Sequence, residues 1–255
     1  HEAGNKFYFQ NYSPNNTATS ISYNDISTIL CDGEGMMWLG TQGGGINTTV
    51  TQTSPFAYHK IETEKSSFSS IRCLFVDKKG IIWMGLGSAG FYQYNRNTGV
   101  YTHNRQLPDF KMLNEIPTVN SIVQSKRDGS IWIGTHGTGV IIYYPNKPSG
   151  QRIINYNQNN LSTLPHGCVF SMLEDKSYNF WLGTKGGLCI CTPNGKSVGF
   201  ASTKIDNIPL NTFAIVSIIQ RRSGEIWLGT SNGGILRAIG SLKQLDKLRF
   251  INYTP

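Results

Sequence analysis

Hydrophobic residues along this chain gather in short runs separated by turns rich in Gly, Asp, Asn and Lys. One set of such runs covers 26–31, 71–76, 119–124, 169–173 and 214–220. Apolar runs of this length between turn residues are typical of β-strands. Helical spacing is almost absent, apart from Leu242, Leu245 and Leu248, which indicate one short turn. The pattern therefore predicts an all-β protein.

A repeat organises these strands. All five tryptophans occur in one phrase, and they lie 45, 49, 49 and 46 residues apart. The five copies read MMWLGTQGGG, IIWMGLGSAG, SIWIGTHGTG, NFWLGTKGGL and EIWLGTSNGG. A period of 40 to 50 residues is typical of β-propellers or of helical repeats, and the strand pattern favours the propeller.

Each period divides into four short β segments. A hairpin turn joins the first run to the Trp strand, which is apolar at consecutive positions, as in Ile81–Met84, and is therefore expected to be buried on both faces. A Gly-rich reversal leads to a third strand and then to a more polar fourth one. We predict a β-propeller with five four-stranded blades, at approximately 14–62, 63–106, 107–158, 159–202 and 203–255.

An additional outer-type strand, Phe7–Tyr12, precedes the first blade and resembles the end of the chain at 249–255. We assign residues 1–13 to the outer strand of a preceding blade, which makes the chain part of a larger propeller of seven blades. The alternative is that this strand closes a five-bladed ring and displaces the last strand, 248–253. Both interpretations remain open from the residues.

Composition narrows the class of protein. Only 15% of the 255 residues are charged, and 28 are Gly, which argues against a helical bundle. No run approaches the ~18 apolar residues of a membrane span, and the polar start of the chain has no feature of a signal peptide. The five cysteines form no CxxC pair and have no histidine at zinc-ligand spacing, so we expect neither a disulfide framework nor a metal or cofactor.

The basic residues outnumber the acidic ones by 23 to 15, and several lie in the hairpin turns. Those turns contain Lys78, Lys79, Lys126, Arg127, Lys176, Arg221 and Arg222. Since such turns project from one end of a propeller, they predict a basic rim that could meet an acidic glycan or an acidic partner domain. The alternative is an ordinary solvated surface.

The phrase IWxGTxxGG, preceded by an apolar run and a D-x-x-G turn, resembles the two-component regulator propeller repeat. The resemblance extends from about Tyr23 to Pro255. The first repeat matches through Asp32, Gly35, Trp38, Gly40, Thr41, Gly43 and Gly44, the third through Asp128, Gly129, Trp132, Gly134, Thr135, Gly137 and Gly139, the fourth through Asp175, Trp181, Gly183, Thr184, Gly186 and Gly187, and the fifth through Gly224, Trp227, Gly229, Thr230, Gly233 and Gly234. The second departs most, with Leu86 and Ala89, and the fourth has Tyr178-Asn179 where the turn Gly is expected.

This resemblance implies a periplasmic sensor region of a hybrid two-component receptor. The family's membrane helix, histidine kinase, receiver and DNA-binding domain have no motif in this chain, so we expect a sensor fragment that is not itself an enzyme. The implied partners are an oligosaccharide ligand, the rest of the sensor chain and a second copy in a homodimer. We expect no nucleic acid, and membrane attachment only through segments outside the chain.

Ligand sites in propellers usually lie where the Gly-rich loops converge on the axis. The residues that vary in these loops are our candidate ligand-binding residues: Gln42, Ser88, His136, Lys185 and Asn232, which follows Ser231. Polar side chains of this kind suit sugar hydroxyls, and Tyr23, Phe68 and Phe213 could stack on sugar rings. His166, in a connection, is interpreted as an ordinary loop histidine.

Two motifs that suggest chemistry have better structural explanations. Gly85 to Gly90 matches G-x-G-x-x-G, but a strand follows it where a dinucleotide site needs a helix. The Asp that precedes each Trp recurs in the turns and is expected to bond turn amides. Glu115 is a lone acid without a partner for glycoside hydrolysis. Two alternatives to the sensor therefore remain, a scaffold propeller without a small ligand and a propeller lyase or hydrolase.

Overall fold

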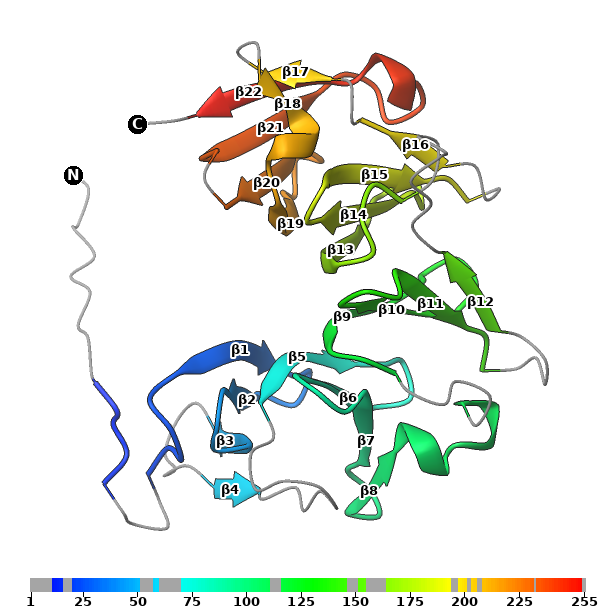
Figure 1. Ribbon diagram of the computed structural model, residues 1–255. Helices are drawn as coiled ribbons and strands as arrows, with labels where there is room; N and C mark the ends of the chain where they lie inside the picture. The colour runs from blue at the N-terminus through cyan, green and yellow to red at the C-terminus, as the bar shows by residue number, and fades with distance from the viewer. Residues whose placement is uncertain are drawn as a thin grey trace, which may run out of the picture. The chain divides into compact units, whose positions relative to one another are not determined.

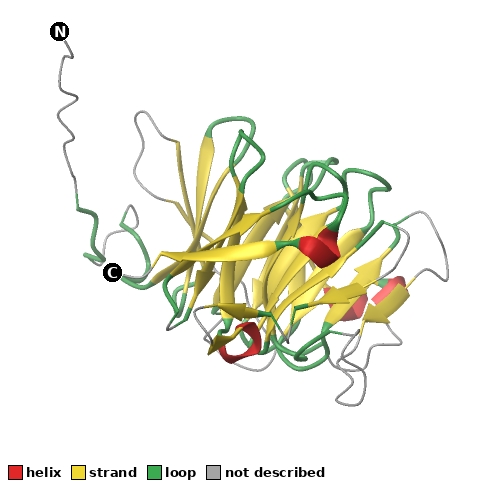
Figure 2. Ribbon diagram, turned by 90° about the horizontal axis from the view of Figure 1, so that it is seen from above, coloured by secondary structure: helices red, strands yellow, loops and turns green. Residues whose placement is uncertain are grey.

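The computed structural model describes residues 11–15, 20–50, 57–59, 70–110, 116–145, 151–154, 164–193, 197–200, 203–205, 208–231 and 233–253. Within these residues the regular structure is five four-stranded antiparallel sheets, one two-stranded hairpin and four short 3₁₀ helices. Strands dominate the molecule in Figure 2. The chain forms two compact units, residues 1–71 and 72–255.

The first unit contains one sheet, with the strands in chain order. These strands are β1 (Ile26–Cys31), β2 (Met36–Thr41), β3 (Ile46–Val50) and β4 (Ala57–His59). The Trp strand, β2, lies between β1 and β3, with Trp38 opposite Leu30 on one side and Thr48 on the other. Both neighbours shield the strand, and Trp38 is buried.

The second unit contains the other four sheets, again with each sheet's strands adjacent in chain order. The strands are β5 (Ile71–Val76), β6 (Ile81–Leu86), β7 (Phe91–Asn95) and β8 (Val100–His103); β9 (Val119–Gln124), β10 (Ile131–Thr135), β11 (Val140–Tyr143) and β12 (Gln151–Ile154); β13 (Val169–Glu174), β14 (Phe180–Thr184), β15 (Gly187–Cys191) and β16 (Ser197–Gly199); and β19 (Ile215–Gln220), β20 (Ile226–Thr230), β21 (Ile235–Ile239) and β22 (Arg249–Tyr253). Figure 1 shows these four sheets following one another.

The hydrophobic core of this unit lies between successive sheets. One cluster joins the second and third blades through Trp83, Phe91 and Ile131, and another joins the third and fourth through Ile142 and Phe180. A third cluster, which includes Trp181, joins the fourth and fifth blades. Because a four-stranded sheet cannot bury two apolar faces alone, stacking the blades face to face supplies the core. The predicted all-β fold of five four-stranded propeller blades is confirmed.

Several details were not predicted. Between β16 and β19 lies a hairpin of β17 (Lys204–Ile205) and β18 (Ile208–Pro209), followed by the 3₁₀ helix η3 (Leu210–Thr212). Two further 3₁₀ helices follow β8, namely η1 (Asn104–Gln106) and η2 (Pro108–Phe110). The turn indicated by the leucine spacing is η4 (Leu245–Lys247).

The last strand of the chain belongs to the fifth sheet. β22 pairs with β21, with Tyr253 opposite Ile235 and Arg249 opposite Ile239. The fifth blade therefore has a fourth strand of its own. Of the additional strand expected at Phe7–Tyr12, residues 7–10 lie outside the described residues, and Asn11 and Tyr12 have no regular secondary structure.

Candidate functional site

The recurring turn aspartate is a structural residue. In the fourth blade, the carboxylate of Asp175 accepts hydrogen bonds from the backbone N–H groups of Ser177 (2.7 Å) and Asn179 (2.9 Å). It also accepts one from the indole Nε1 of Trp181 at 2.8 Å. Asp32 with Trp38 and Asp77 with Trp83 repeat the indole bond, at 2.7 and 2.9 Å. The prediction that this aspartate bonds the turn amides is confirmed. The structure shows in addition that its carboxylate binds the indole of the tryptophan.

The third and fifth blades depart from this arrangement. Trp132 donates to the hydroxyl of Ser130 (3.1 Å), and that hydroxyl donates to Asp128 (2.6 Å). In the fifth blade, Arg221 occupies the position of the aspartate. The Nε1 atom of Trp227 has no hydrogen-bond partner among the described residues.

The threonine of the repeated phrase shapes the Gly-rich loop. The hydroxyl of Thr135 donates to the carbonyl of Gly139 at 2.9 Å, and Thr184 donates to Gly187 at 2.8 Å. The residue after each threonine, His136 or Lys185, is anchored through its backbone and exposed through its side chain. The loop therefore presents one variable side chain on a constant frame.

The structure brings two of the five predicted residues together, around Cys168. Lys185 donates its backbone N–H to the carbonyl of Cys168 (3.0 Å), and His136 forms an isolated antiparallel β-bridge with Cys168. His166 joins them, because its Nδ1 atom accepts the backbone N–H of Cys168 at 2.9 Å. We call His136, His166 and Lys185 the basic cluster of the third and fourth blades.

The surroundings of the basic cluster change the pKa of His166. Partial burial lowers the pKa of this imidazole, and the positive charges of Lys185 and His136 lower it further. His166 was interpreted as an ordinary loop histidine, and no sequence signal marks it, since it lies 30 residues from His136. Lys185 contributes a positive charge to this surface and the histidine rings contribute N–H donors, a combination that suits an anionic ligand.

The other candidate residues lie apart from this cluster. Ser88 is exposed in the loop between β6 and β7, and Gln42 is exposed in the first unit. Asn232, Phe68 and Glu115 lie outside the described residues. Tyr23 is exposed, as a stacking residue must be. The stacking role expected of Phe213 is wrong, because this side chain is buried in the core between the fourth and fifth blades.

Part of the predicted basic rim holds neighbouring blades together. The Nζ atom of Lys176 donates to the backbone carbonyl of Arg222, in the turn of the next blade, at 2.7 Å. Lys78 reaches the carbonyl of Lys126 in the same way at 3.4 Å. Arg221 pairs with Glu225 in its own turn at 3.2 Å. These charged side chains therefore form contacts between and within the hairpin turns.

The described residues contain neither a cluster of metal ligands nor a membrane-spanning helix. No three His, Cys, Asp or Glu side chains within the described ranges come together as metal ligands would. Among the same residues, no helix has the length and apolar character needed to cross a membrane.

The repeats are similar in sequence to those of known proteins. The profile of the family described as "Two component regulator propeller" matches residues 20–43 and 163–186. Histidine kinase P4 of Formosa agariphila is 30% identical over 188 residues, which are 71% of this chain and 13% of the kinase. The chain thus spans about an eighth of that relative's length.

Solved structures share the fold. The extracellular domain of a protein assigned as a hybrid two-component system of B. thetaiotaomicron superposes with a TM-score of 0.53 at 15% identity, over 91% of this chain and 36% of that one. An inactive virginiamycin B lyase of Staphylococcus aureus superposes with a TM-score of 0.63 at 14% identity, over 89% and 70%. At these identities the structures show the propeller fold alone. The profile match, the 30% identity to a histidine kinase over 71% of this chain and the five copies of the phrase together show that this chain belongs to the two-component regulator propeller family.

Proposed function

We propose that this chain is an extracytoplasmic ligand-sensing propeller of a hybrid two-component receptor, and that it recognises an oligosaccharide. The histidine kinase to which it relays lies outside these residues. The similarity to a histidine kinase over 188 residues supports the assignment to a two-component receptor. The extracellular domain that shares the fold supports a location outside the cytoplasm, and we propose the periplasm as the compartment.

The observation that carries the proposal is the basic cluster. His136, His166 and Lys185 belong to two neighbouring blades, and hydrogen bonds to Cys168 hold the backbone of Lys185 and the ring of His166 in place. A preorganised set of donors loses little entropy when a ligand binds. Carboxylate or sulfate groups of an acidic oligosaccharide would accept from these donors, and its hydroxyls would bond to the polar loop residues.

Binding affects a distant kinase only if the ligand has different affinities for two arrangements of the receptor. A ligand that bridges loops of two blades favours the arrangement in which both loops face it. We therefore assign sensing to this chain and the enzymatic step to the parent protein.

Thermal unfolding against a panel of acidic and neutral oligosaccharides tests the proposal. A ligand at 100 times its dissociation constant stabilises the protein by about 2.7 kcal/mol, which raises Tm by roughly 5–10 °C for a chain of this size. We expect one class of acidic glycan to give this shift, and Lys185→Ala and His136→Ala to reduce it. Lys79→Ala, which removes an exposed lysine from a turn of the second blade, is the matched control.

If no glycan changes Tm in a sample that unfolds cooperatively, the proposal is wrong. The scaffold alternative would then be favoured, and one observation supports it. The fifth blade exposes Ile219, Ile235 and Ile251 on its surface, as a protein contact would require.

A further inference from the structure

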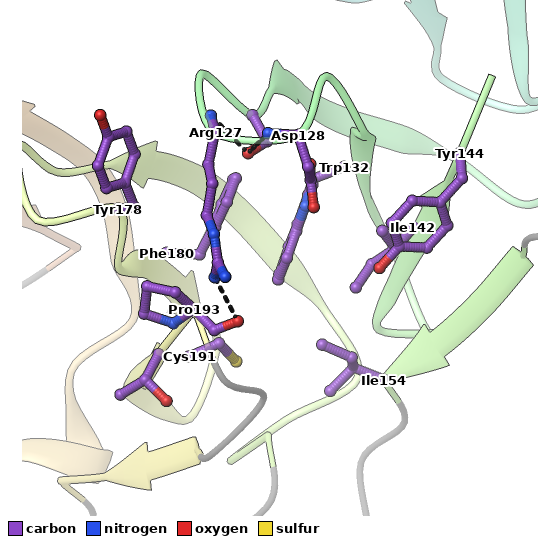
Figure 3. Close-up of a pocket in the computed structure, with 12 residues that line it drawn as sticks. Arg127, Asp128, Trp132, Ile142, Tyr144, Ile154, Tyr178, Phe180, Cys191 and Pro193 are labelled. Atoms are coloured by element: carbon purple, nitrogen blue, oxygen red, sulfur yellow. Dashed lines mark hydrogen bonds between the residues drawn. The ribbon is translucent and has the colours of Figure 1, made fainter. Parts of the chain in front are cut away.

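A second concave site lies between the third and fourth blades, away from the loops of the basic cluster. Figure 3 shows this cleft, which the Arg127 side chain crosses toward Pro193. Tyr178 and Phe180 lie on one side of the cleft, and Tyr144 and Ile142 lie on the other. Its volume is about 210 Å³, enough for a single ring-sized group.

Three departures from the repeat create this cleft. The first is in the turn of the third blade, which has one residue more than the others. The backbone N–H of Ser125 bonds to the carbonyl of Ser130, five residues on, whereas Asp175 bonds to Asn179, four residues on. The longer turn contains Arg127 and Asp128, which are both exposed at the cleft.

The second departure removes the direct bond between the turn carboxylate and the indole, and places Ser130 between them. In the first, second and fourth blades the turn aspartate holds the indole of the tryptophan, but in the third blade Ser130 does so. Asp128 is thereby free of the indole and lies at the mouth of the cleft. Although partial burial raises its pKa, hydrogen bonds from the side chain and backbone of Ser130 lower it below its usual value, so the group is a carboxylate.

The third departure is Tyr178. In the other four blades this turn position is glycine with a positive φ, namely Gly35, Gly80, Gly129 and Gly224. Tyr178 has a φ of 63° and is the one non-glycine residue with a positive φ among the residues that the structure describes. A side chain in this backbone region costs energy, and such costs gather at binding sites. The exposed ring lines the cleft.

The aromatic lining is fixed in place. The indole of Trp132 stacks on the buried ring of Phe180 with 3.7 Å between centroids and 4° between planes. The hydrogen bond to Ser130 holds the indole in that orientation. Arg127 donates from Nη1 to the carbonyl of Pro193 at 2.7 Å, which positions the guanidinium across the cleft. An aromatic surface, a guanidinium and a carboxylate are thus preorganised around one small space.

We propose that this cleft binds one pyranose unit of a glycan, with the sugar's C–H face against the aromatic side chains and its hydroxyls bonded by Arg127 and Asp128. A carboxylate accepts from neighbouring hydroxyls and a guanidinium donates to them, while the rings cover the apolar face of the sugar. The mouth has one positive and one negative group, so a neutral hexose fits it better than an acidic one. This inference rests on the proposed function only in taking the ligand to be a glycan.

Fluorine NMR of the whole chain labelled with 5-fluorotryptophan tests the cleft directly. The five tryptophans give five resonances, and Trp132→Phe, which keeps a ring against Phe180, assigns the one from the cleft. The probes are the methyl pyranosides of glucose, galactose, mannose and glucuronic acid, each titrated to about 50 mM. We expect a neutral pyranoside to shift the Trp132 resonance and to leave the other four in place.

Two variants and one control complete the test. Arg127→Ala and Asp128→Asn should each weaken binding about tenfold, the usual effect of losing a hydrogen bond to a charged group. Arg222→Ala removes an exposed arginine from the corresponding turn of the fifth blade and should have no effect. The proposal is overturned if no pyranoside shifts Trp132, or if the shift persists in both variants. It is also overturned if N-acetyl-tyrosinamide shifts Trp132 and the sugars do not, since the site would then bind a peptide side chain.

These results are separable from those for the basic cluster. If acidic oligosaccharides raise Tm and Lys185→Ala abolishes the effect while Trp132 never shifts, the sensor proposal stands and the cleft proposal fails. If the pyranosides shift Trp132 but no oligosaccharide effect depends on Lys185 or His136, the cleft is a glycan site and the basic cluster is not.

Discussion

At the level of single residues, four hydrogen-bond donors surround the buried carboxylate of Asp175. This buried carboxylate accepts from two backbone N–H groups, from the side-chain amide of Asn179 and from the indole of Trp181. Removal of this carboxylate leaves all four donors without an acceptor. The turn and the tryptophan therefore depend on one side chain.

We predict that Asp175→Ala lowers the free energy of unfolding by about 3 kcal/mol or more, because buried donors lose their partner. Asp175→Asn, which keeps one oxygen, should lower it less. Urea unfolding followed by tryptophan fluorescence measures both. Asp246→Ala, at an exposed aspartate of η4, is the control, and a cost for Asp175→Ala no larger than the control's would contradict the structural role.

His166 leads to a prediction about pH. Its pKa in the folded protein lies below the ordinary value of 6.5, because of partial burial and the charges of Lys185 and His136. The unfolded chain therefore binds more protons as the pH falls through about 6.5, and the folded state loses stability there. The loss stops growing below the folded pKa.

We expect His166→Gln to reduce the fall in Tm between about pH 7.5 and about pH 5.5, because the variant has no imidazole to protonate at this position. Differential scanning calorimetry at the two pH values measures the fall. An equal fall in the variant and the parent would show that His166 does not contribute to it.

At the scale of strands and blades, the glycine two residues after each tryptophan allows close packing. A Cβ atom on Gly183 would lie 2.7 Å from the backbone carbonyl oxygen of Ile215, in the next blade, and 2.8 Å from the hydroxyl of Ser171. A Cβ atom on Gly229, in the fifth blade, would meet only the side chain of Ser217. The glycine is thus needed most where another blade follows.

We predict that Gly183→Ala costs about 1–3 kcal/mol of stability, because the two blades must move apart. Adding Ser171→Ala should not restore the loss, since the carbonyl of Ile215 remains in place. In the fifth blade, Ser217→Ala should restore most of what Gly229→Ala loses. Urea unfolding of the single and double variants measures this, and rescue of Gly183→Ala by Ser171→Ala would contradict the proposed contact.

At the scale of the whole molecule, the fifth sheet differs from the fourth in what covers it. Leu173 of β13 packs into the core between the fourth and fifth blades. Ile219 of β19, which has the same place opposite its tryptophan, is 59% exposed. This face of the fifth sheet exposes the apolar side chains of Ile219, Ile235 and Ile251, a surface that another protein element could cover.

The comparison of Leu173→Thr with Ile219→Thr tests this difference. Both changes introduce threonine, which is β-branched and compatible with a strand, so the difference between their costs reflects burial. We expect Leu173→Thr to cost at least 1 kcal/mol more than Ile219→Thr, whose cost should stay within about 0.5 kcal/mol, as for an exposed position. Equal losses of unfolding free energy in the two variants would show that Ile219 is covered in solution. If the loss in Ile219→Thr then changed with protein concentration, a second copy of the chain would be the cover; if it did not, another part of the same chain would be.

The candidate sites were predictable to different degrees. His136 and Lys185 could be proposed because each follows a threonine that closes a Gly-rich loop, which is a local pattern. His166 could not, because its place beside them results from a β-bridge and hydrogen bonds to Cys168. Phe213 was misassigned because exposure in a connection depends on the packing of two blades. The cleft at Trp132 also went unnoticed, although the additional turn residue and Tyr178 were visible departures from the repeat.

Local sequence patterns are enough to predict the fold, since strand length, turn chemistry and the position of each Trp, Gly and Thr repeat five times along the chain. The packing of the blades determines which faces are covered and which loop residues come into contact. The physical reason is that a blade buries its apolar faces against its neighbours. The contacts that build the basic cluster and the cleft are therefore made between residues of different repeats, and no periodic pattern within one repeat records them.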